Sequence, residues 1–539
     1  ETVQDSVLAD KAVENAEGVW LAHEFEIFRT LGDTLVQVAN LDSTIENNIM
    51  DFVELPKNSG EYFFGTTGEG VFHYKDDELK LYSTEDGLAS RYAWNFYVDS
   101  KQNLWVTSYL GISVWNGGGF TPVQLAESSE GIQLNRVLED TEGNYWIGSL
   151  GDGLFKLRPS DITTIGLENG LKNDKMLSLT TLNDGRYLFA TNCGGVYEYE
   201  PSSKKVSQPS ISAELPNQCI WSVFQDSKDR IWFGSRILYR SNSLSETGVT
   251  IDKNDGFTGR DIFTISEDSK GNIWIGALNG LYKYDGESYF RYSTNNGLSY
   301  NDTRAVFEDR DGVIWVGTSG GLNKIVNGTA VPVDLIKEQG INDRSNKPYV
   351  RAIHQDEEGV MWIGTYGNGI FRIKDGATTA IKKEDGLHDN IVSHIEEDKD
   401  GYFWMGSNRG IFRVHKSELN EFAEGKISRV NGFVYGMNDG MLSSETNGGF
   451  EPNVINNGDG KLYFPTISGV AVVSTENPGE ERRPPKVYIE SVKNGDNDLS
   501  DEDEISLEYN NAFLQIDYTA LSFRDPDKIT FRYTLEGLN

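Results

Sequence analysis

Side chains suited to holding a ligand recur at corresponding places along this chain of 539 residues. Aromatic faces beside Arg and Asn are the usual means of binding sugars and carboxylated ligands, through ring stacking and paired hydrogen bonds. Such residues follow Gly-Leu loops and precede apolar strands, and they vary where the surrounding pattern is constant. The alternative is that they are ordinary exposed loop residues. The sequence predicts ligand contacts by eight of them: Trp221, Arg260, Tyr300, Arg304, Tyr349, Arg351, His388 and Asn390.

Residues that could catalyse a reaction or bind a metal show no such pattern. The 6 His residues lack the paired spacing of metal ligands, and the acidic runs lack the pattern of calcium loops. We therefore expect no catalytic motif, no metal site and no cofactor. Cys193 and Cys219 match no metal motif, and we interpret both as small buried residues, with their bonding left open.

A further pair of residues, Asp and Trp, recurs too often to be catalytic. Asp268 precedes Trp274 by the same interval as Asp309 precedes Trp315, and several other units repeat the pair. A catalytic group is needed once, whereas a structural group is needed in every unit. Asp and Gly at these offsets are typical of a tight turn, so we predict turn and core roles for the pair.

The elements that carry these residues are short strands in a repeat of about 42 residues. The Trp of strings such as Gly271-Asn-Ile-Trp-Ile-Gly276 marks one slot in each repeat, and alternating apolar residues around it indicate strands. Four strands per repeat favour β-propeller blades over a β-solenoid, whose coils are shorter. Eleven residues occupy the slot: Trp20, Phe63, Trp105, Trp146, Leu188, Trp232, Trp274, Trp315, Trp362, Trp404 and Tyr463.

The repeat resembles the two-component regulator propeller repeat of bacterial sensor regions. The resemblance rests on loops such as Glu384-Asp-Gly-Leu387 followed by a strand and then the Asp, Gly and Trp pattern. The segment from Ala520 to Pro526, with Phe531 to Leu538, resembles the first half of a triple-tyrosine domain, which is a β-sandwich. These resemblances and the repeat predict an all-β chain of about eleven four-stranded blades, parts of two seven-bladed rings, and the start of an immunoglobulin-like sandwich.

The predicted domains follow from where the period begins and stops. We expect a partial N-terminal propeller over residues 1–165, a seven-bladed propeller over 166–478, a connector over 479–485 and an incomplete sandwich over 486–539. A single propeller usually holds four to eight blades, which is why eleven units imply two rings.

The composition and the resemblance together limit the possible functions of the chain. Asp and Glu number 83 against 49 Lys and Arg, a net charge of −34, which argues against binding nucleic acid. The resemblance implies the ligand-sensing region of a bacterial transmembrane signalling protein, on the periplasmic or extracellular side of the inner membrane and without catalytic activity of its own. It also implies a small-molecule or oligosaccharide ligand, a homodimer formed through the sandwich, and a membrane-anchored parent chain. The alternatives are a secreted propeller enzyme, such as a lyase or glycan-active enzyme, and a protein-binding scaffold.

Overall fold

The computed structural model describes residues 11–523 with gaps, and five positions beyond them. The gaps are 16–17, 24–25, 32–33, 41–48, 57–58, 77, 109, 124–131, 159, 161, 337–346, 477–484, 496 and 501–513, and the later positions are 526, 529, 531, 533 and 534. Most of the predicted connector and about half of the triple-tyrosine motif therefore lie outside the described residues. The chain divides into two compact units, Glu1–Pro159 with Glu480–Asn539, and Ser160–Gly479.

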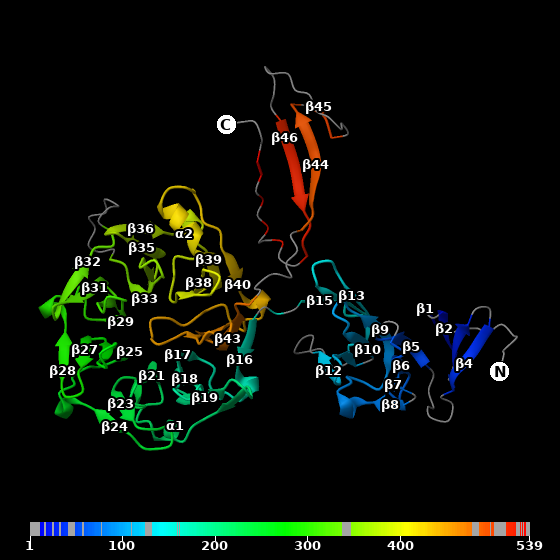
Figure 1. The fold of residues 1–539 in the computed structure, drawn as a ribbon, viewed down its shortest axis with the longest axis horizontal. Helices are drawn as coiled ribbons and strands as arrows, with labels where there is room; N and C mark the ends of the chain where they lie inside the picture. The colour runs from blue at the N-terminus through cyan, green and yellow to red at the C-terminus, as the bar shows by residue number, and fades with distance from the viewer. Residues whose placement is uncertain are drawn as a thin grey trace. The chain divides into compact units, whose positions relative to one another are not determined.

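The second unit is a ring of sheets (Figure 1). Each sheet is antiparallel. In the sheets formed by four consecutive strands, the first strand in chain order lies innermost, in contact with the first strand of the next such sheet for most neighbouring pairs. Over the described residues of this unit the strands form seven four-stranded sheets: β17 (Met176–Thr181), β18 (Tyr187–Thr191), β19 (Val196–Glu200), β20 (Lys205–Ser207); β21 (Ser222–Gln225), β22 (Ile231–Gly234), β23 (Leu238–Ser241), β24 (Val249–Ile251); β25 (Ile262–Glu267), β26 (Ile273–Ala277), β27 (Gly280–Tyr284), β28 (Tyr289–Tyr292); β29 (Thr303–Glu308), β30 (Ile314–Thr318), β31 (Gly321–Val326), β32 (Thr329–Val333); β33 (Val350–Gln355), β34 (Met361–Thr365), β35 (Ile370–Lys374), β36 (Ala377–Ile381); β37 (Glu396–Glu397), β38 (Tyr402–Ser407), β39 (Gly410–His415), β40 (Phe433–Tyr435); and β16 (Ile162–Ile165) with β41 (Ile455–Asn456), β42 (Lys461–Thr466) and β43 (Gly469–Ser474).

The last of these sheets joins the two ends of the unit. Strand β16 pairs antiparallel with β43, from Ile162 opposite Val473 to Ile165 opposite Val470. The outermost strand of the final blade is thus supplied by the start of the unit, which closes the ring by backbone hydrogen bonds. The unit begins at Ser160, ahead of the boundary at residue 166 that the sequence predicts, because β16 belongs to this sheet.

The recurring Asp and Trp are structural, as their repetition predicts. The indole Nε1 of Trp274 donates to Asp268 Oδ2 at 2.8 Å, while Asp268 Oδ1 accepts the backbone N–H groups of Lys270 and Asn272. One carboxylate therefore holds both the turn and the buried ring. The same indole bond forms in six further pairs: Asp99 and Trp105, Asp140 and Trp146, Asp226 and Trp232, Asp309 and Trp315, Asp356 and Trp362, and Asp398 and Trp404.

The core lies between neighbouring blades. Trp232 of β22 packs with Ile265 of β25 and Tyr282 of β27, all of them buried. Loops of the Asp-Gly-Leu kind form single 3-10 turns such as Lys253–Asp255 and Lys383–Asp385, each ended by a Gly with positive φ. At Gly386, with φ of 104°, a Cβ would meet the Val430 carbonyl oxygen at 2.1 Å, so this turn requires Gly. Among the described residues the α-helices are α1 (Ile211–Glu214) and α2 (Lys416–Ala423), and none is long and apolar enough to cross a membrane.

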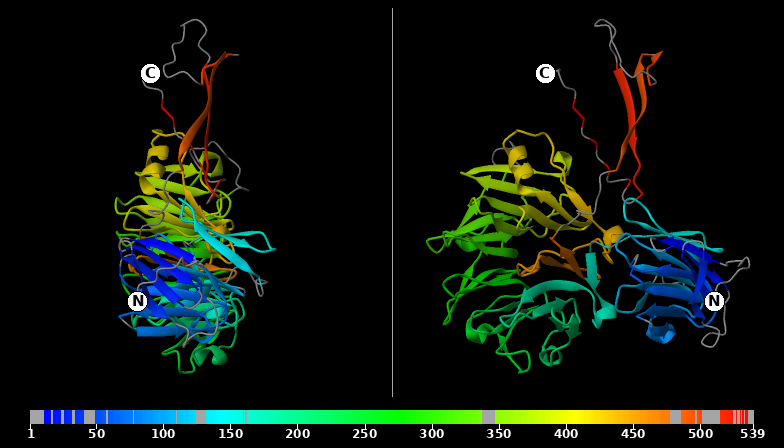
Figure 2. Two further views of the ribbon diagram at one scale, coloured as in Figure 1. Left: turned by 90° about the vertical axis from the view of Figure 1, so that its right-hand side faces the viewer. Right: turned by 45° about the vertical axis from the view of Figure 1, so that its right-hand side comes forward.

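The first unit contains blades of the same kind. Figures 1 and 2 also show β44 and β46 side by side in its C-terminal part, where they pair antiparallel. Its described strands are β1 (Lys11–Asn15), β2 (Gly18–His23), β3 (Glu26–Leu31), β4 (Thr34–Asn40); β5 (Ile49–Glu54), β6 (Tyr62–Thr66), β7 (Val71–Lys75), β8 (Glu78–Tyr82); β9 (Ala93–Val98), β10 (Leu104–Ser108), β11 (Gly111–Trp115), β12 (Phe120–Val123); β13 (Leu134–Glu139), β14 (Tyr145–Ser149), β15 (Leu154–Leu157); and β44 (Val487–Asn494), β45 (Asn497–Asp498), β46 (Leu514–Ala520).

The fold class is as predicted, an all-β chain built from four-stranded antiparallel blades. The strands β44, β45 and β46 form one three-stranded sheet. An immunoglobulin-like sandwich over residues 486–539 therefore stays a prediction.

Candidate functional site

The inner strands of consecutive blades place side chains at the centre of the ring through a repeated β-bulge. In β25, Ile262 pairs with Ala277 and Thr264 with Gly276, so Phe263 between them has no partner in the ladder. Arg304 of β29 and Arg351 of β33 occupy the same unpaired position. A bulge turns its extra residue out of the pleat and bends the strand. The same feature in these three blades thus directs Phe263, Arg304 and Arg351 toward one site.

The residues at this position and their neighbours form a continuous group, which we call the aromatic–arginine cluster. Trp221 stacks on Phe263 with ring centroids 5.6 Å apart, and the guanidinium of Arg304 lies 3.5 Å from the centroid of Phe263. The guanidinium of Arg351 lies 4.4 Å from the centroid of Tyr349 and 4.9 Å from that of Tyr366. The members are Trp221, Phe263, Arg304, Tyr349, Arg351, Tyr366 and Phe450.

The two arginines of the cluster differ in their electrostatic surroundings. Arg304 Nε lies 2.6 Å from Asp302 Oδ1, and its Nη2 donates to Asp302 Oδ2 at 3.2 Å, so its charge is compensated. Arg351 donates through Nη1 to the Gly448 carbonyl, but its buried Nε has no hydrogen-bond partner. Burial lowers the pKa of Arg351 below its usual value, although an arginine remains charged at neutral pH. The cluster therefore combines aromatic faces with a partly buried positive charge.

Residues 446–455, here called the channel segment, run through the middle of the ring, in orange in Figure 1. The backbone of Glu451 donates to the Phe263 carbonyl at 3.0 Å and accepts from the Ile265 N–H at 3.2 Å. The Pro452 carbonyl accepts from Leu179 N–H at 3.2 Å. The segment thus fills the centre beneath the cluster, and its Phe450 is itself a member of the cluster.

The Glu451 carboxyl group is held in this interior. Its Oε2 accepts a long hydrogen bond of 3.4 Å from the Val306 N–H. Burial raises its pKa to about 8, so the group is largely protonated at neutral pH. His394, also buried and in contact with the Phe464 ring, has its pKa lowered by burial to about 3 and is therefore neutral. Neither residue adds a full charge beside Arg351 at pH 7.

The structure brings together four of the eight residues that the sequence predicts, Trp221, Arg304, Tyr349 and Arg351. The other four lie elsewhere at the same end of the blades. Arg260 and Tyr300 are exposed, with the Arg260 N–H bonded to Asn279 Oδ1 at 3.1 Å. His388 contacts the Arg409 carbonyl at 3.3 Å, and Asn390 Oδ1 accepts from the Lys383 N–H at 2.8 Å. Asn390 and His388 thus stabilise loops of their own region.

Sequence reasoning missed Phe263, Tyr366 and Phe450. Phe263 occupies the same position as Arg304 and Arg351, one residue after the start of an inner strand, and alignment of the repeats by this position identifies it. Tyr366 follows β34 in the turn toward β35 and carries no repeated signal. Phe450 lies in the channel segment, outside the period, so no alignment of repeats could place it.

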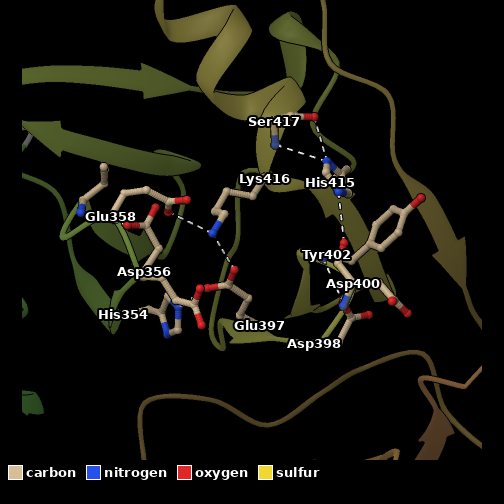
Figure 3. A network of polar contacts seen from close by, with 12 residues as sticks. His354, Asp356, Glu358, Glu397, Asp398, Asp400, Tyr402, His415, Lys416 and Ser417 are labelled. Carbon is tan, nitrogen blue, oxygen red and sulfur yellow. Dashed lines mark hydrogen bonds and ion pairs between the residues drawn. The ribbon is translucent and has the colours of Figure 1, made fainter.

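The opposite ends of the blades hold a network of ion pairs between two neighbouring blades (Figure 3). Lys416 Nζ, at the start of α2, lies 2.7 Å from Glu397 Oε1 and 2.9 Å from Glu358 Oε2. Burial lowers the pKa of Lys416, but its bonds to Glu397 and Glu358 outweigh this and raise it to about 12. His354 Nε2 lies 3.3 Å from Glu397 Oε2. Lys416 pairs with a carboxylate of each of the two blades, which indicates a structural link between them.

The interpretation of the cysteines as small buried residues is wrong. Cys193 and Cys219 form a disulfide, and Cys193 is exposed in the turn between β18 and β19. Cys219 lies in the loop that leads to β21, in the next blade. The repeat spacing alone could not show that these two loops adjoin at the same end of the ring. Within the described residues, no group of three or more His, Cys, Asp or Glu side chains is arranged to hold a metal ion.

Comparison with known proteins identifies the repeat. The family described as two component regulator propeller matches residues 214–236, 256–279, 297–320, 344–367 and 386–409. Histidine kinase P4 of Formosa agariphila is 23% identical over 258 residues, which cover 44% of this chain and 17% of the kinase. The extracellular domain of a hybrid two component system from B. thetaiotaomicron is 17% identical, with a TM-score of 0.57 over 96% of this chain and 76% of that one.

These matches show two-component regulator propeller repeats in the second unit and the propeller fold. The aligned part spans about a sixth of the kinase, whose activity belongs to the kinase as a whole. The solved structure, at 17% identity, is similar to this chain in fold.

Proposed function

We propose that this chain is the extracytoplasmic ligand-sensing region of a bacterial transmembrane signal-transduction protein, and that its ligand is a carbohydrate. The aromatic–arginine cluster carries the proposal. Stacking faces and fixed hydrogen-bond donors are the groups that a sugar requires, and here they converge from consecutive blades at one end of a ring. The repeats and the similarity to a two-component sensor domain support the signalling role.

The cluster offers both a rigid base and an exposed surface. Phe263 is buried, whereas Tyr366, another member of the cluster, is 44% exposed. Hydrogen bonds from the channel segment fix the backbone beneath these residues. A preformed site of this kind costs little ordering free energy when it binds.

The disulfide supports an extracytoplasmic location. Disulfide bonds form and persist in oxidising compartments such as the periplasm and the cell exterior, and they are rare in the cytosol. The bond between Cys193 and Cys219 joins two blades at the end that carries the cluster. It therefore suits a sensor whose binding face is formed by loops of several blades.

The remaining parts of the proposal concern the whole protein. We place the second unit as one seven-bladed propeller and the first four units as part of another, followed by a sandwich that forms a homodimer. The parent chain is anchored in the inner membrane and passes the signal through the sandwich to an output domain. The kinase relative, which is much longer than the matched part, supports such an arrangement.

Calorimetric titration of the whole 539-residue chain against a panel of neutral and acidic oligosaccharides tests the proposal. We expect binding by at least one member, and a loss of about tenfold or more in affinity for Tyr349→Ala, which removes one aromatic face. Phe290→Ala is the matched control, because Phe290 is an exposed aromatic residue of the outermost strand β28. Absence of binding by folded protein, or turnover of a bound sugar, would contradict the proposal.

A further inference from the structure

Arg351 differs in its charge partners from three other partly buried arginines of the second unit. Arg186 contacts Asp184 and Glu198, Arg230 contacts Asp226, and Arg372 approaches Glu424. Among the described residues, no carboxylate lies within 4.0 Å of the Arg351 guanidinium. The chain carries a net charge of −34, so a partly buried cation without a carboxylate partner is unexpected. A buried charge is costly unless it is paired.

The contacts of Arg351 leave part of its hydrogen-bonding capacity unused. Its Nη1 donates to the Gly448 carbonyl, and its Nε is buried without a partner. Holding the channel segment is one role for this side chain, yet a neutral donor could bond a carbonyl without the cost of burying a charge. An arginine, by contrast, presents a planar fork of donors that matches a carboxylate or a sulfate.

The surroundings of Arg351 favour an anion at the open side of the cluster. Its guanidinium contacts the rings of both Tyr349 and Tyr366, at 4.4 and 4.9 Å from their centroids, and Arg304 lies 5.9 Å from the same Tyr349 ring. Arg304 is compensated by Asp302, so the local excess is one positive charge. The exposed Tyr366 adds a face on which a sugar ring can stack.

We propose that the ligand of the aromatic–arginine cluster is an acidic carbohydrate, whose carboxylate or sulfate ester pairs with Arg351 while a sugar ring stacks on Tyr366. The inference rests on the proposed function and specifies the class of sugar that it would sense. Arg304 contributes a second cation at longer range, and Asp302 keeps it in place. The anion supplies the charge partner that the protein itself does not provide to Arg351.

Titration with matched sugars tests the inference on the whole chain. The probes are oligogalacturonates, their methyl esters, which have the same rings without charge, and sulfated galactan oligosaccharides. We expect the unesterified or the sulfated probe to bind at least about tenfold more tightly than the esters, with affinity that falls as NaCl increases. Preference between these two probes identifies carboxylate or sulfate as the anion.

Two substitutions separate charge from structure. Arg351→Gln, which keeps a donor for Gly448, should weaken acidic-sugar binding by about tenfold or more, and Arg351→Lys should retain more of it. Lys324→Gln, which removes a cation that lies over Trp315 away from the cluster, should leave affinity unchanged. Thermal unfolding shows whether each variant is folded. The salt dependence of acidic-sugar binding is measured on the unsubstituted chain and so tests the inference even if a variant fails to fold.

The outcomes distinguish this inference from the proposed function. Binding of neutral sugars alone, or equal affinity for acids and esters, overturns the acidic class and leaves a carbohydrate sensor. Tight acid binding that Arg351→Gln does not alter also overturns it. If the folded chain binds none of the probes and no neutral oligosaccharide, both proposals fail.

Discussion

The guanidinium of Arg304 lies 3.5 Å from the centroid of the Phe263 ring, so that a charged side chain of one blade covers an aromatic side chain of its neighbour. Both residues occupy the unpaired bulge position of their inner strands. A contact of this kind links two blades at the centre of the ring, where the channel segment also binds to the backbone of Phe263.

A double-mutant cycle measures this contact. Arg304→Gln and Phe263→Leu should each lower the free energy of unfolding, and together they should cost less than the sum of the two. We expect a coupling of about 0.5–2 kcal/mol from urea unfolding, because the pair is largely desolvated. Additive effects would show that the two blades are not coupled through these side chains.

The Asp and Trp pairs should make the chain sensitive to acid. Burial raises the pKa of Asp268, but hydrogen bonds from Trp274 and Asn272 outweigh this and hold it below the usual value. The pKa values of Asp99 and Asp140 are lowered in the same way. A carboxyl group whose pKa is lower in the folded than in the unfolded chain stabilises the fold above about pH 4. This stabilisation is lost as the pH falls further.

The substitution Asp268→Asn tests that relationship. It should lower the free energy of unfolding at pH 7 by about 1–3 kcal/mol, since the Trp274 indole loses its charged acceptor. It should also weaken the fall in stability between about pH 4 and pH 2. Glu287→Gln is the control, because Glu287 is an exposed carboxylate of the same blade. Equal pH profiles for the variant and the unsubstituted chain would contradict the prediction.

Much of this architecture could be predicted from the sequence, because it is repeated. The slot of Trp274 and its Asp268 indicates the turn, the strand and the core position of each blade. The closure by β16 could not be predicted, since the segment 162–165 is too short and too far from β43 to show a pairing. The positions of recurring residues can be predicted from the repeat. The pairing between the two ends of the unit occurs once and cannot be predicted in this way.

The candidate site was predicted only in part for the same reason. Arg304 and Arg351 were identified because they follow recognisable loops, but the bulge that groups them with Phe263 is a feature of strand pairing. Phe450 reaches the cluster through the channel segment, whose path depends on contacts with several blades. Such long-range contacts leave no local pattern in the sequence.

Glu451 gives the opposite dependence on pH. Burial raises its pKa to about 8, above the value in the unfolded chain. A raised carboxyl pKa stabilises the fold fully below about pH 4, and this contribution is lost progressively as pH rises to about 8. Glu451→Gln removes this titrating group. The free energy of unfolding of the variant, compared with that of the unsubstituted chain, should therefore be higher at pH 8 than at pH 5 by about 1 kcal/mol or more. Urea unfolding at both pH values measures the difference, and no change in it would refute a buried, protonated Glu451.

The disulfide should stabilise the ring by linking two blades. Cys193 and Cys219 are separated by 26 positions, and cross-links over loops of this size typically contribute about 2–4 kcal/mol. The double variant Cys193→Ser with Cys219→Ser should unfold at lower urea concentration. A reductant should shift the unsubstituted chain to the same midpoint and leave the variant unchanged. If the reductant acts equally on both, the stabilisation does not come from this bond.

Closure of the ring by β16 should depend on the side chains that this strand buries. Ile162 is 1% exposed and packs with Trp404, Leu462 and Val473 of the last two blades, whereas Thr163 beside it is exposed. Ile162→Ala leaves a cavity at the seam, and we expect it to lower the free energy of unfolding by about 2–5 kcal/mol. Thr163→Ala should change it by no more than about 0.5 kcal/mol. Urea unfolding compares the two, and hydrogen exchange of the β43 amides reports whether the seam opens before the rest of the ring. Equal effects of both substitutions, or unaltered exchange along β43 in Ile162→Ala, would mean that β16 does not hold the ring closed.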